Sequence, residues 1–135
     1  MKLIIATHGQ AGAGLVNTLS MFVEQIDKVE IFCLDNRGQN YFKQELEDYL
    51  QKNKQEQIIA FTDILGGSPF QTCLQLKANL NLNLEVISGV NFPMLLDTYL
   101  HLNDDFMDVI ARAITSGQEG ITNPQLNNNN NVDDE

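Results

Sequence analysis

Four short segments along the chain are rich in β-branched and other apolar residues. They cover residues 2–7, 29–34, 57–63 and 84–88, and most of them are continuous apolar runs, without regular alternation of apolar and polar positions. Strands that are covered on both faces have this pattern, because neither set of side chains points to water. The segments therefore predict four strands of a buried sheet.

Apolar residues recur at helical spacing in the stretches between and after these segments. The positions that share a helical face are Leu15, Leu19, Phe22, Val23 and Ile26; Phe42, Leu46, Tyr49 and Leu50; Phe70, Cys73 and Leu74; and Phe106, Val109, Ile110, Ala113 and Ile114, with a further helix start at Pro93. The alternation of strands and helices predicts an α/β fold, an open and mostly parallel sheet with helices on both faces. Right-handed crossovers favour the strand order 2-1-3-4, numbered along the chain.

The helical pattern fades from about Gly117. Residues 119–123, EGITN, are the candidate for an additional C-terminal edge strand, and the sequence ends in the low-complexity run NNNNNVDDE. Such a run has too few apolar residues to form a core. We therefore expect a single domain over residues 1–120 and a disordered, Asn-rich acidic tail over residues 121–135.

Charge and cysteine content narrow the range of functions. The formal net charge of -10 at pH 7 argues against nucleic acid as a partner, which requires a basic face. No apolar run approaches the roughly 20 residues of a membrane span, and the N-terminus lacks the features of a signal peptide, so we expect a cytoplasmic protein. Cys33 and Cys73 lie in apolar surroundings without a metal-site spacing, and we expect both to be reduced core residues.

The side chains that could take part in catalysis or ligand binding follow the carboxyl ends of the predicted strands. These residues are Thr7 and His8; Asn36 and Arg37; Asp63, Gly66, Gly67 and Ser68; and Ser88 and Asn91. Ligands of open α/β sheets bind at this edge, especially where the strand order reverses. Because the order 2-1-3-4 places the first and third strands side by side, His8 and Asp63 are predicted to be neighbours.

A carboxylate beside an imidazole has a defined chemical effect. When it accepts a hydrogen bond from one ring nitrogen, it fixes the tautomer, aims the ring and leaves the other nitrogen with an exposed lone pair. His8 paired with Asp63 in this way would be an oriented nucleophile.

The segment DILGGSPF, residues 63–70, predicts the other half of a site. Ser68 followed by Pro69 indicates a helix start, with serine as the N-cap and proline at the first helical position. Gly66 and Gly67 allow the backbone to approach a ligand closely, and the amino end of a helix attracts anions. An imidazole that faces such a helix end indicates transfer of a phosphoryl group to the imidazole.

Three motifs together resemble a known family. THGQAGAGL, FTDILGGSPF and SGVNFPMLL, in this order and spacing, are similar to the IIA domain of the mannose family of the bacterial phosphoenolpyruvate-dependent sugar phosphotransferase system, over about residues 2–120. The resemblance implies a homodimeric α/β phosphocarrier that accepts a phosphoryl group from HPr and passes it to a IIB component. It also implies that no metal or other cofactor is required and that the membrane components IIC and IID are reached only indirectly.

The resemblance also assigns roles to individual residues. His8 matches the phosphorylated histidine, and Asp63 matches the carboxylate that orients it. The residues expected beside the phosphate are Gly66, Gly67 and Ser68, and those expected to border the site are Thr7, Gly9 and Asn91. The small residues Gly9, Ala11 and Gly12 are interpreted as space for the phosphohistidine ring of a partner protein.

Other functions fit part of the pattern. The main alternative is a small-molecule, flavin-like binder on a flavodoxin-like fold, although the loop THGQAGAG offers a phosphate only the hydroxyl of Thr7. A signalling receiver needs an acidic cluster after the first strand, where this chain has His8. A hydrolase with Ser68 as its nucleophile would lack the usual nucleophile-elbow sequence.

Several other residues have structural interpretations. His101 is expected to interact with the carboxyl end of a helix, and Arg37 to be a solvated loop charge. Asn91 is expected to cap the next helix more than to contact phosphate. Met94 and Leu95 are expected to pack in the core, with an apolar docking surface for HPr or IIB as the second interpretation.

Overall fold

The computed structural model describes residues 1–126 of the chain. Its elements are β1 (Lys2–His8), α1 (Ala11–Leu19), β2 (Val29–Leu34), α2 (Gln39–Lys52), β3 (Ile58–Thr62), α3 (Ser68–Leu80), β4 (Leu84–Ile87), α4 (Phe92–Leu100) and α5 (Phe106–Glu119). The predicted alternation of strands and helices is confirmed. Most of the tail expected over residues 121–135 lies outside the described residues. Among the helices of residues 1–126, none has the length and apolar character to cross a membrane.

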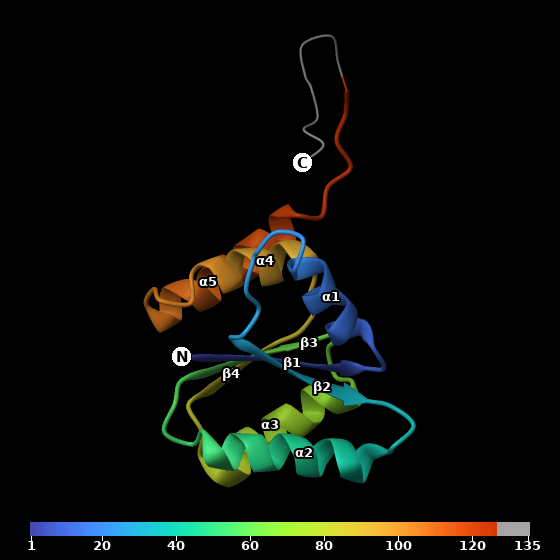
Figure 1. Cartoon of the computed structure of the whole chain (residues 1–135), viewed down its shortest axis with the longest axis vertical. Coiled ribbons are helices and arrows are strands. Elements are labelled where there is room, and N and C mark those ends of the chain that lie inside the picture. The colour runs from blue at the N-terminus through green and yellow to red at the C-terminus, as the bar shows by residue number, and fades with distance from the viewer. Residues whose placement is uncertain (127–135) are drawn as a thin grey trace.

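The four strands form one parallel sheet in the order β2-β1-β3-β4, which confirms the predicted order. Helices α1, α4 and α5 lie over one face of this sheet, and α2 and α3 lie under the other (Figure 1). Because the strands are parallel, all of their carboxyl ends meet at one edge. The order reverses at β1, which has β2 on one side and β3 on the other.

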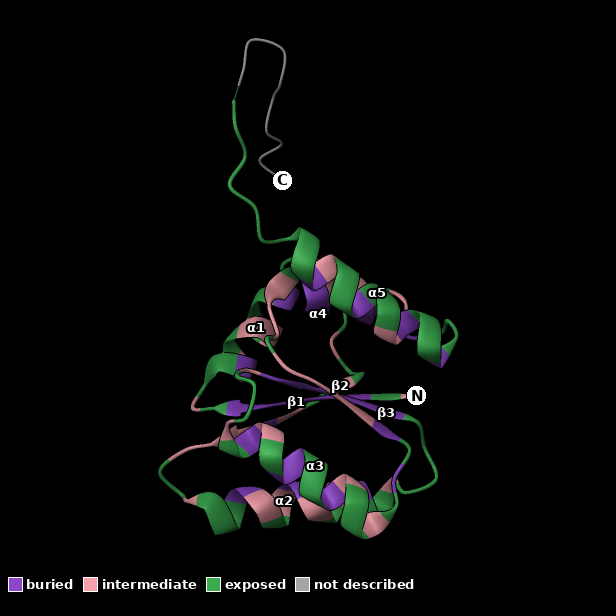
Figure 2. Ribbon diagram, turned by 180° about the vertical axis from the view of Figure 1, so that it is seen from behind, coloured by how far each residue is buried: buried purple, intermediate pink, exposed green. Residues whose placement is uncertain are grey.

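The molecule has two hydrophobic layers, one on each face of the sheet, and alternate residues of β1 point into one or the other. Leu3 and Ile5 pack with residues of α1, α4 and α5, whereas Ile4 and Ala6 pack with residues of α2 and α3. Each of these side chains is at most 1% exposed. Figure 2 shows the buried strands between helices whose outer faces are exposed. Burial on both faces is the reason that the strand is a continuous apolar run.

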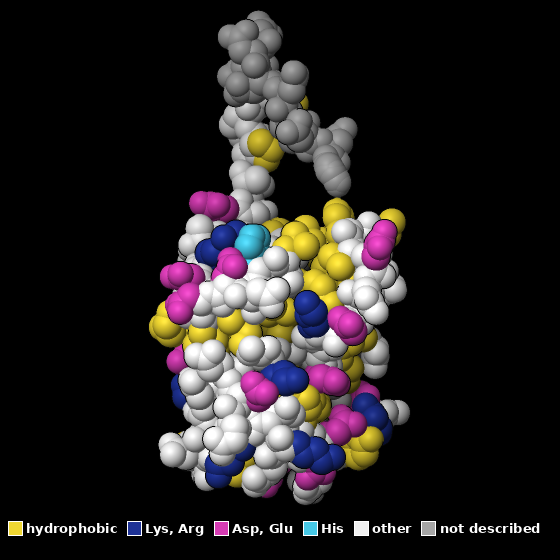
Figure 3. Space-filling view, turned by 60° about the vertical axis from the view of Figure 1, so that its left-hand side comes forward, with side chains coloured by type: hydrophobic (Ala, Val, Ile, Leu, Met, Phe, Trp, Pro, Cys, Tyr) yellow, Lys and Arg dark blue, Asp and Glu magenta, His cyan; other side chains and the backbone are white. Residues whose placement is uncertain are grey.

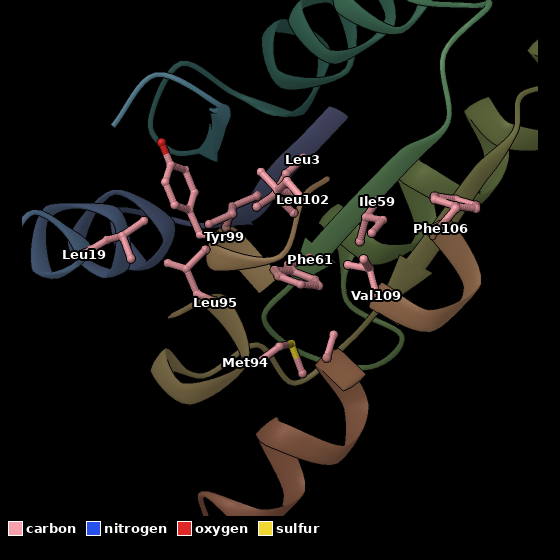
Figure 4. Packing of buried hydrophobic residues seen from close by; sticks show 12 residues of the cluster. Leu3, Leu19, Ile59, Phe61, Met94, Leu95, Tyr99, Leu102, Phe106 and Val109 are labelled. Atoms are coloured by element: carbon pink, nitrogen blue, oxygen red, sulfur yellow. The ribbon is translucent and has the colours of Figure 1, made fainter. Parts of the chain in front are cut away.

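Met94 and Leu95 of α4 belong to the first of these layers. They are 4% and 0% exposed and lie near Phe61 of β3 in the packed cluster (Figure 4). Their interpretation as packing residues is confirmed. The same burial removes both side chains from any docking surface for a partner protein.

Helix α1 is shorter than its apolar spacing predicts. It ends at Leu19, so the assignment of Phe22, Val23 and Ile26 to the helix is wrong. Val23 and Ile26 pack against the core from the loop that follows, whereas Phe22 is 50% exposed and its ring centroid lies 5.1 Å from that of Phe92. The N–H groups after the helix end bond to carbonyls three residues back, which tightens the chain into a turn. The Tyr99 hydroxyl then holds the loop by donating to the carbonyl of Gln25 over 2.9 Å.

Residues 119–123 do not form the additional edge strand. Helix α5 continues to Glu119, and residues 121–126 belong to no helix or strand. The helix continues because its last turn is fixed by tertiary contacts that the local sequence does not reveal. The Gly117 carbonyl accepts a hydrogen bond of 2.9 Å from the Asn91 side chain, and a Cβ on Gly117 would lie 2.9 Å from Cε of Met94.

The carboxyl end of α4 is joined to α5 through His101. Nδ1 of its ring lies 2.7 Å from the carbonyl oxygen of Asp97, in the last turn of α4, as expected for a helix-end histidine. Nη2 of Arg112, from α5, lies 3.1 Å from Nε2 of His101 and 3.0 Å from the carboxylate of Asp97. These contacts give His101 a structural role.

Both cysteines are free thiols. Cys73 is fully buried in the layer of α2 and α3, and burial raises its pKa to about 12. Cys33 is partly buried, and burial together with the nearby charge of Asp35 raises its pKa as well. Thiols with raised pKa values are poor nucleophiles at neutral pH. The expected role as a core residue is confirmed for Cys73, whereas Cys33 lies in neither core cluster.

Candidate functional site

His8 is the last residue of β1, and Asp63 follows directly after β3. Nδ1 of the His8 ring lies 3.0 Å from Oδ2 of Asp63, and the backbone N–H of His8 donates to the same oxygen over 3.0 Å. The other carboxylate oxygen accepts a 3.0 Å hydrogen bond from the N–H of Ile64. The two side chains are therefore in contact, as the strand order predicts, because β1 and β3 are adjacent.

The protonation of this pair follows from its hydrogen bonds. Burial disfavours the charged form of Asp63, but the hydrogen bonds from the His8 backbone and ring outweigh burial and hold the pKa of Asp63 below its usual value. An ionised carboxylate can only accept, so Nδ1 of His8 carries the proton and donates. In the neutral ring this tautomer leaves the lone pair on Nε2, and the side chain is 48% exposed.

Gly67 lies against the His8 ring. A Cβ atom on Gly67 would come 2.9 Å from Cε1 of His8 and 2.6 Å from Cγ2 of Ile64, closer than side-chain atoms pack. The backbone of Gly67, with φ -70°, suits any residue, so glycine is needed there for space. At Gly66 the reason is conformational, because φ is +79° and no atom of the described residues lies within 4 Å of a Cβ position.

Helix α3 begins at Ser68 with Gly67 as its N-cap, so the prediction of Ser68 as the N-cap is wrong. The N–H of Gly67 donates to the carbonyl of Ile64 over 3.1 Å, and this turn brings Gly67 into the capping position. The same bond occupies the Gly67 N–H. Within residues 1–126, the N–H groups of Ser68 and Phe70 have no hydrogen-bond acceptor, which leaves them free at the helix end.

Thr7 supports helix α1 from the end of the strand. Its side chain is fully buried, and Oγ1 accepts a 2.8 Å hydrogen bond from the N–H of Gly12. The N-cap residue itself, Gln10, makes no side-chain capping hydrogen bond within residues 1–126. No local sequence pattern indicates this role, because capping side chains normally come from the residue next to the helix and not from a strand.

Glycine is required at positions 9 and 12, after His8, for two different reasons. Gly9 has φ +54°, in the left-handed region that favours glycine, and a Cβ there would have no atom of residues 1–126 within 4 Å. A Cβ on Gly12 would lie 2.8 Å from Cγ2 of Ile5, so Gly12 is needed to bring α1 close to β1. The interpretation of Gly12 as space for a partner ring is therefore wrong, since the residue is buried against the strand.

Replacing Thr7 by valine is expected to lower the free energy of unfolding by about 1–3 kcal/mol, because the buried N–H of Gly12 loses its acceptor. Urea denaturation followed by circular dichroism measures this loss. The matched control is Thr18→Val, which removes an exposed hydroxyl of the same helix and is expected to change stability by less than about 0.5 kcal/mol. Equal stabilities of the two variants would contradict the role of Thr7 as a cap.

Two other predicted residues have clear structural partners. Asn91 caps α4, because its side-chain oxygen accepts a 3.1 Å hydrogen bond from the N–H of Met94. This agrees with its capping interpretation. Arg37 is not simply a solvated charge, since Nη2 lies 2.8 Å from the carboxylate of Asp35 and the guanidinium lies 4.5 Å from the ring centroid of Tyr41.

The hydrolase alternative finds no support in this arrangement. The one hydrogen-bonded ring nitrogen of His8 faces Asp63, and no hydrogen bond in residues 1–126 joins His8 to Ser68. A serine nucleophile needs such a contact with its base. Within residues 1–126, no three His, Cys, Asp or Glu side chains gather closely enough to hold a metal ion.

Most of the chain matches one family model. Residues 2–115 match EIIA-man, described as "PTS system fructose IIA component". Among curated proteins, the PTS system mannose-specific EIIAB component of Escherichia coli (strain K12) is 28% identical over 125 residues. The matched part is 90% of this chain but 38% of that protein, so the chain spans well under half the length of the curated relatives it matches.

Solved structures show the same fold. The phosphotransferase system component EIIA from Streptococcus agalactiae is 27% identical with a TM-score of 0.81, over 90% of this chain and 95% of that one. The mannose/sorbose specific IIA subunit from Enterococcus faecalis has a TM-score of 0.84 at 20% identity, over 93% of this chain and 96% of that one. At this lower identity the likeness concerns the fold alone.

Proposed function

The chain belongs to the EIIA-man family, the IIA components of sugar phosphotransferase systems, and on this premise we propose that it carries the phosphoryl group on Nε2 of His8. The phosphocarrier role itself is that of the family. The main support for this proposal is the 3.0 Å contact between Nδ1 of His8 and Oδ2 of Asp63. Because this contact occupies Nδ1, it leaves Nε2 as the nucleophile.

In the proposed step, the lone pair of Nε2 attacks the phosphorus atom of a phosphohistidine in the donor protein. The new Nε2–P bond forms while the N–P bond of the donor breaks, and the electrons of that bond return to the donor imidazole. Phosphoryl transfer passes through a loose transition state, so the protein mainly positions groups and stabilises charge. The carboxylate of Asp63 holds the His8 ring and stabilises the positive charge that builds up on it.

The phosphoryl oxygens are proposed to lie at the amino end of α3. The free N–H groups of Ser68 and Phe70 are the donors at this helix end, and one well-aimed donor in such a site is worth about 3 kcal/mol. Gly66 gives the loop its turn. The N–H of Gly67 is already used by Ile64, so the expected contact of Gly67 with phosphate is replaced by a role in making room for the ring.

The partners follow from the family. HPr is the proposed phosphoryl donor and a IIB component the acceptor, with the membrane components IIC and IID reached only through IIB. A homodimer is proposed on the same ground, as is a cytoplasmic location, where phosphoenolpyruvate is available. The transported sugar is a property of the membrane components and is not part of this proposal.

The proposal is tested by incubation with phosphoenolpyruvate, enzyme I and HPr. Intact mass spectrometry is expected to show the gain of one phosphoryl group, which is lost in mild acid and absent in His8→Ala. The control is His101→Ala, because His101 is the other histidine of the chain and should not affect the gain. No gain with active HPr contradicts the proposal, and NMR evidence for phosphate on Nδ1 contradicts the assignment to Nε2.

A further inference from the structure

Two apolar side chains stand exposed in the loop between β3 and α3. Ile64 is 57% exposed and Leu65 is 73% exposed. The backbone of this loop is fixed, because the N–H of Ile64 donates to Asp63 over 3.0 Å and its carbonyl accepts from Gly67 over 3.1 Å. An exposed leucine alone needs no explanation, so its position relative to the site is what matters.

This loop lies at the rim of the His8 ring. A Cβ on Gly67 would touch Cγ2 of Ile64 at 2.6 Å and Cε1 of His8 at 2.9 Å, so both groups border the same point. A protein that transfers a phosphoryl group directly to Nε2 must bring its own ring into contact with His8. Its surface therefore covers the loop that carries Leu65.

The segments around His8 are almost free of charge, although the chain as a whole has a formal net charge of -10. Residues 9–23, 64–76 and 86–96 contain no Asp, Glu, Lys or Arg. In the loop after β2, at the same edge of the sheet, Nη2 of Arg37 lies 2.8 Å from the carboxylate of Asp35, so these two charges cancel. By contrast, acidic and basic side chains are scattered over the face of the molecule shown in Figure 3. An edge with so little net charge allows an anionic phosphoprotein to approach an acidic chain.

We propose that Leu65, next to Ile64 in this loop, is the apolar anchor that binds the phosphoryl-donor protein, by packing against an apolar patch beside the donor's phosphohistidine. The proposal rests on the proposed function. It assigns to this loop the docking role that burial excludes for Met94 and Leu95. A few well-packed side chains near the centre of an interface contribute most of the binding energy, whereas surrounding contacts contribute little.

The test separates docking from the chemistry at His8 by using two phosphoryl donors. Leu65→Ser is expected to raise the KM for phospho-HPr by about tenfold, with kcat nearly unchanged, because only binding of the protein donor is weakened. Labelling of His8 by phosphoramidate, a small donor that needs no docking surface, should stay at the wild-type rate. Leu65→Met should restore most of the activity with HPr, because it keeps an apolar side chain of similar volume.

The matched control is Met107→Ser, which removes an exposed apolar side chain, 61% exposed, from the first turn of α5. This variant should leave the KM for phospho-HPr unchanged. An unchanged KM for phospho-HPr in Leu65→Ser overturns the inference. An equal loss of phosphorylation rate with both donors also overturns it, because it shows that Leu65 acts on His8 itself. Conversion of a dimer to a monomer in Leu65→Ser, measured by light scattering, overturns it in favour of a second copy as the occupant. Failure of the wild-type protein to be labelled at His8 by either donor refutes the proposed function itself.

Discussion

Replacing Asp63 by asparagine is expected to slow phosphoryl transfer from HPr to His8 by about a hundredfold or more, with the fold intact. The asparagine side chain has the shape of aspartate but no charge. If its oxygen faces Nδ1, it stabilises the developing ring charge poorly. If its NH2 group faces Nδ1, it donates to this nitrogen, and the proton of the ring moves to Nε2, which then has no lone pair. Rapid-quench measurement of phosphoprotein formation gives the rate.

The control for this substitution is Asp35→Asn, which neutralises a carboxylate at the end of β2 that is paired with Arg37 and not with His8. Its transfer rate should stay within a few-fold of wild type. The stability of the wild-type protein has an expected dependence on pH that Asp63→Asn lacks. Because the folded pKa of Asp63 lies below its ordinary value of 3.8, the carboxylate stabilises the fold above that value, and this contribution is lost as the pH falls through the lowered pKa. A transfer rate near that of wild type in Asp63→Asn would remove this carboxylate from the mechanism.

Gly67→Ala is expected to reduce the transfer rate by about a hundredfold, because a misplacement of the reacting ring by about 1 Å has an effect of this size. The added methyl group would lie 2.9 Å from Cε1 of His8 and 2.6 Å from Ile64, so the ring or the loop must move. The backbone itself accepts alanine, and the stability loss should be modest, about 1–3 kcal/mol. The NMR signals of the His8 ring and the rate of labelling by phosphoramidate report the displacement.

The neighbouring glycine provides the matched control. Gly66→Ala places a methyl group in open space but forces alanine to adopt φ +79°, which costs about 1–2 kcal/mol. This variant should therefore lose stability while its folded form keeps the transfer rate within a few-fold. If Gly66→Ala impaired transfer more than Gly67→Ala, the assignment of Gly67 as the residue that makes room for the ring would be wrong.

The sequence by itself determined the strands, the layers and the approximate position of the site. Leu3 to Ala6 are apolar without interruption, which only a strand covered on both faces requires. The alternation with helices and the rule of right-handed crossovers then lead to the observed strand order. Since that order places β1 beside β3, the contact between His8 and Asp63 follows from the strand order alone. These features follow from periodicity, which is local, and from topology, which has few solutions.

The tertiary structure alone decided how each residue of the site is used. Thr7 caps α1 from within a strand, and Gly67 makes room for the ring of His8, which lies on another element. The exposure of Leu65 and the burial of Met94 could not be distinguished in the sequence either, because both are apolar residues near a strand end. Each of these roles depends on a contact or a direction set by a segment far away in the chain. A pattern of neighbouring residues does not contain that information, and only the packed fold supplies it.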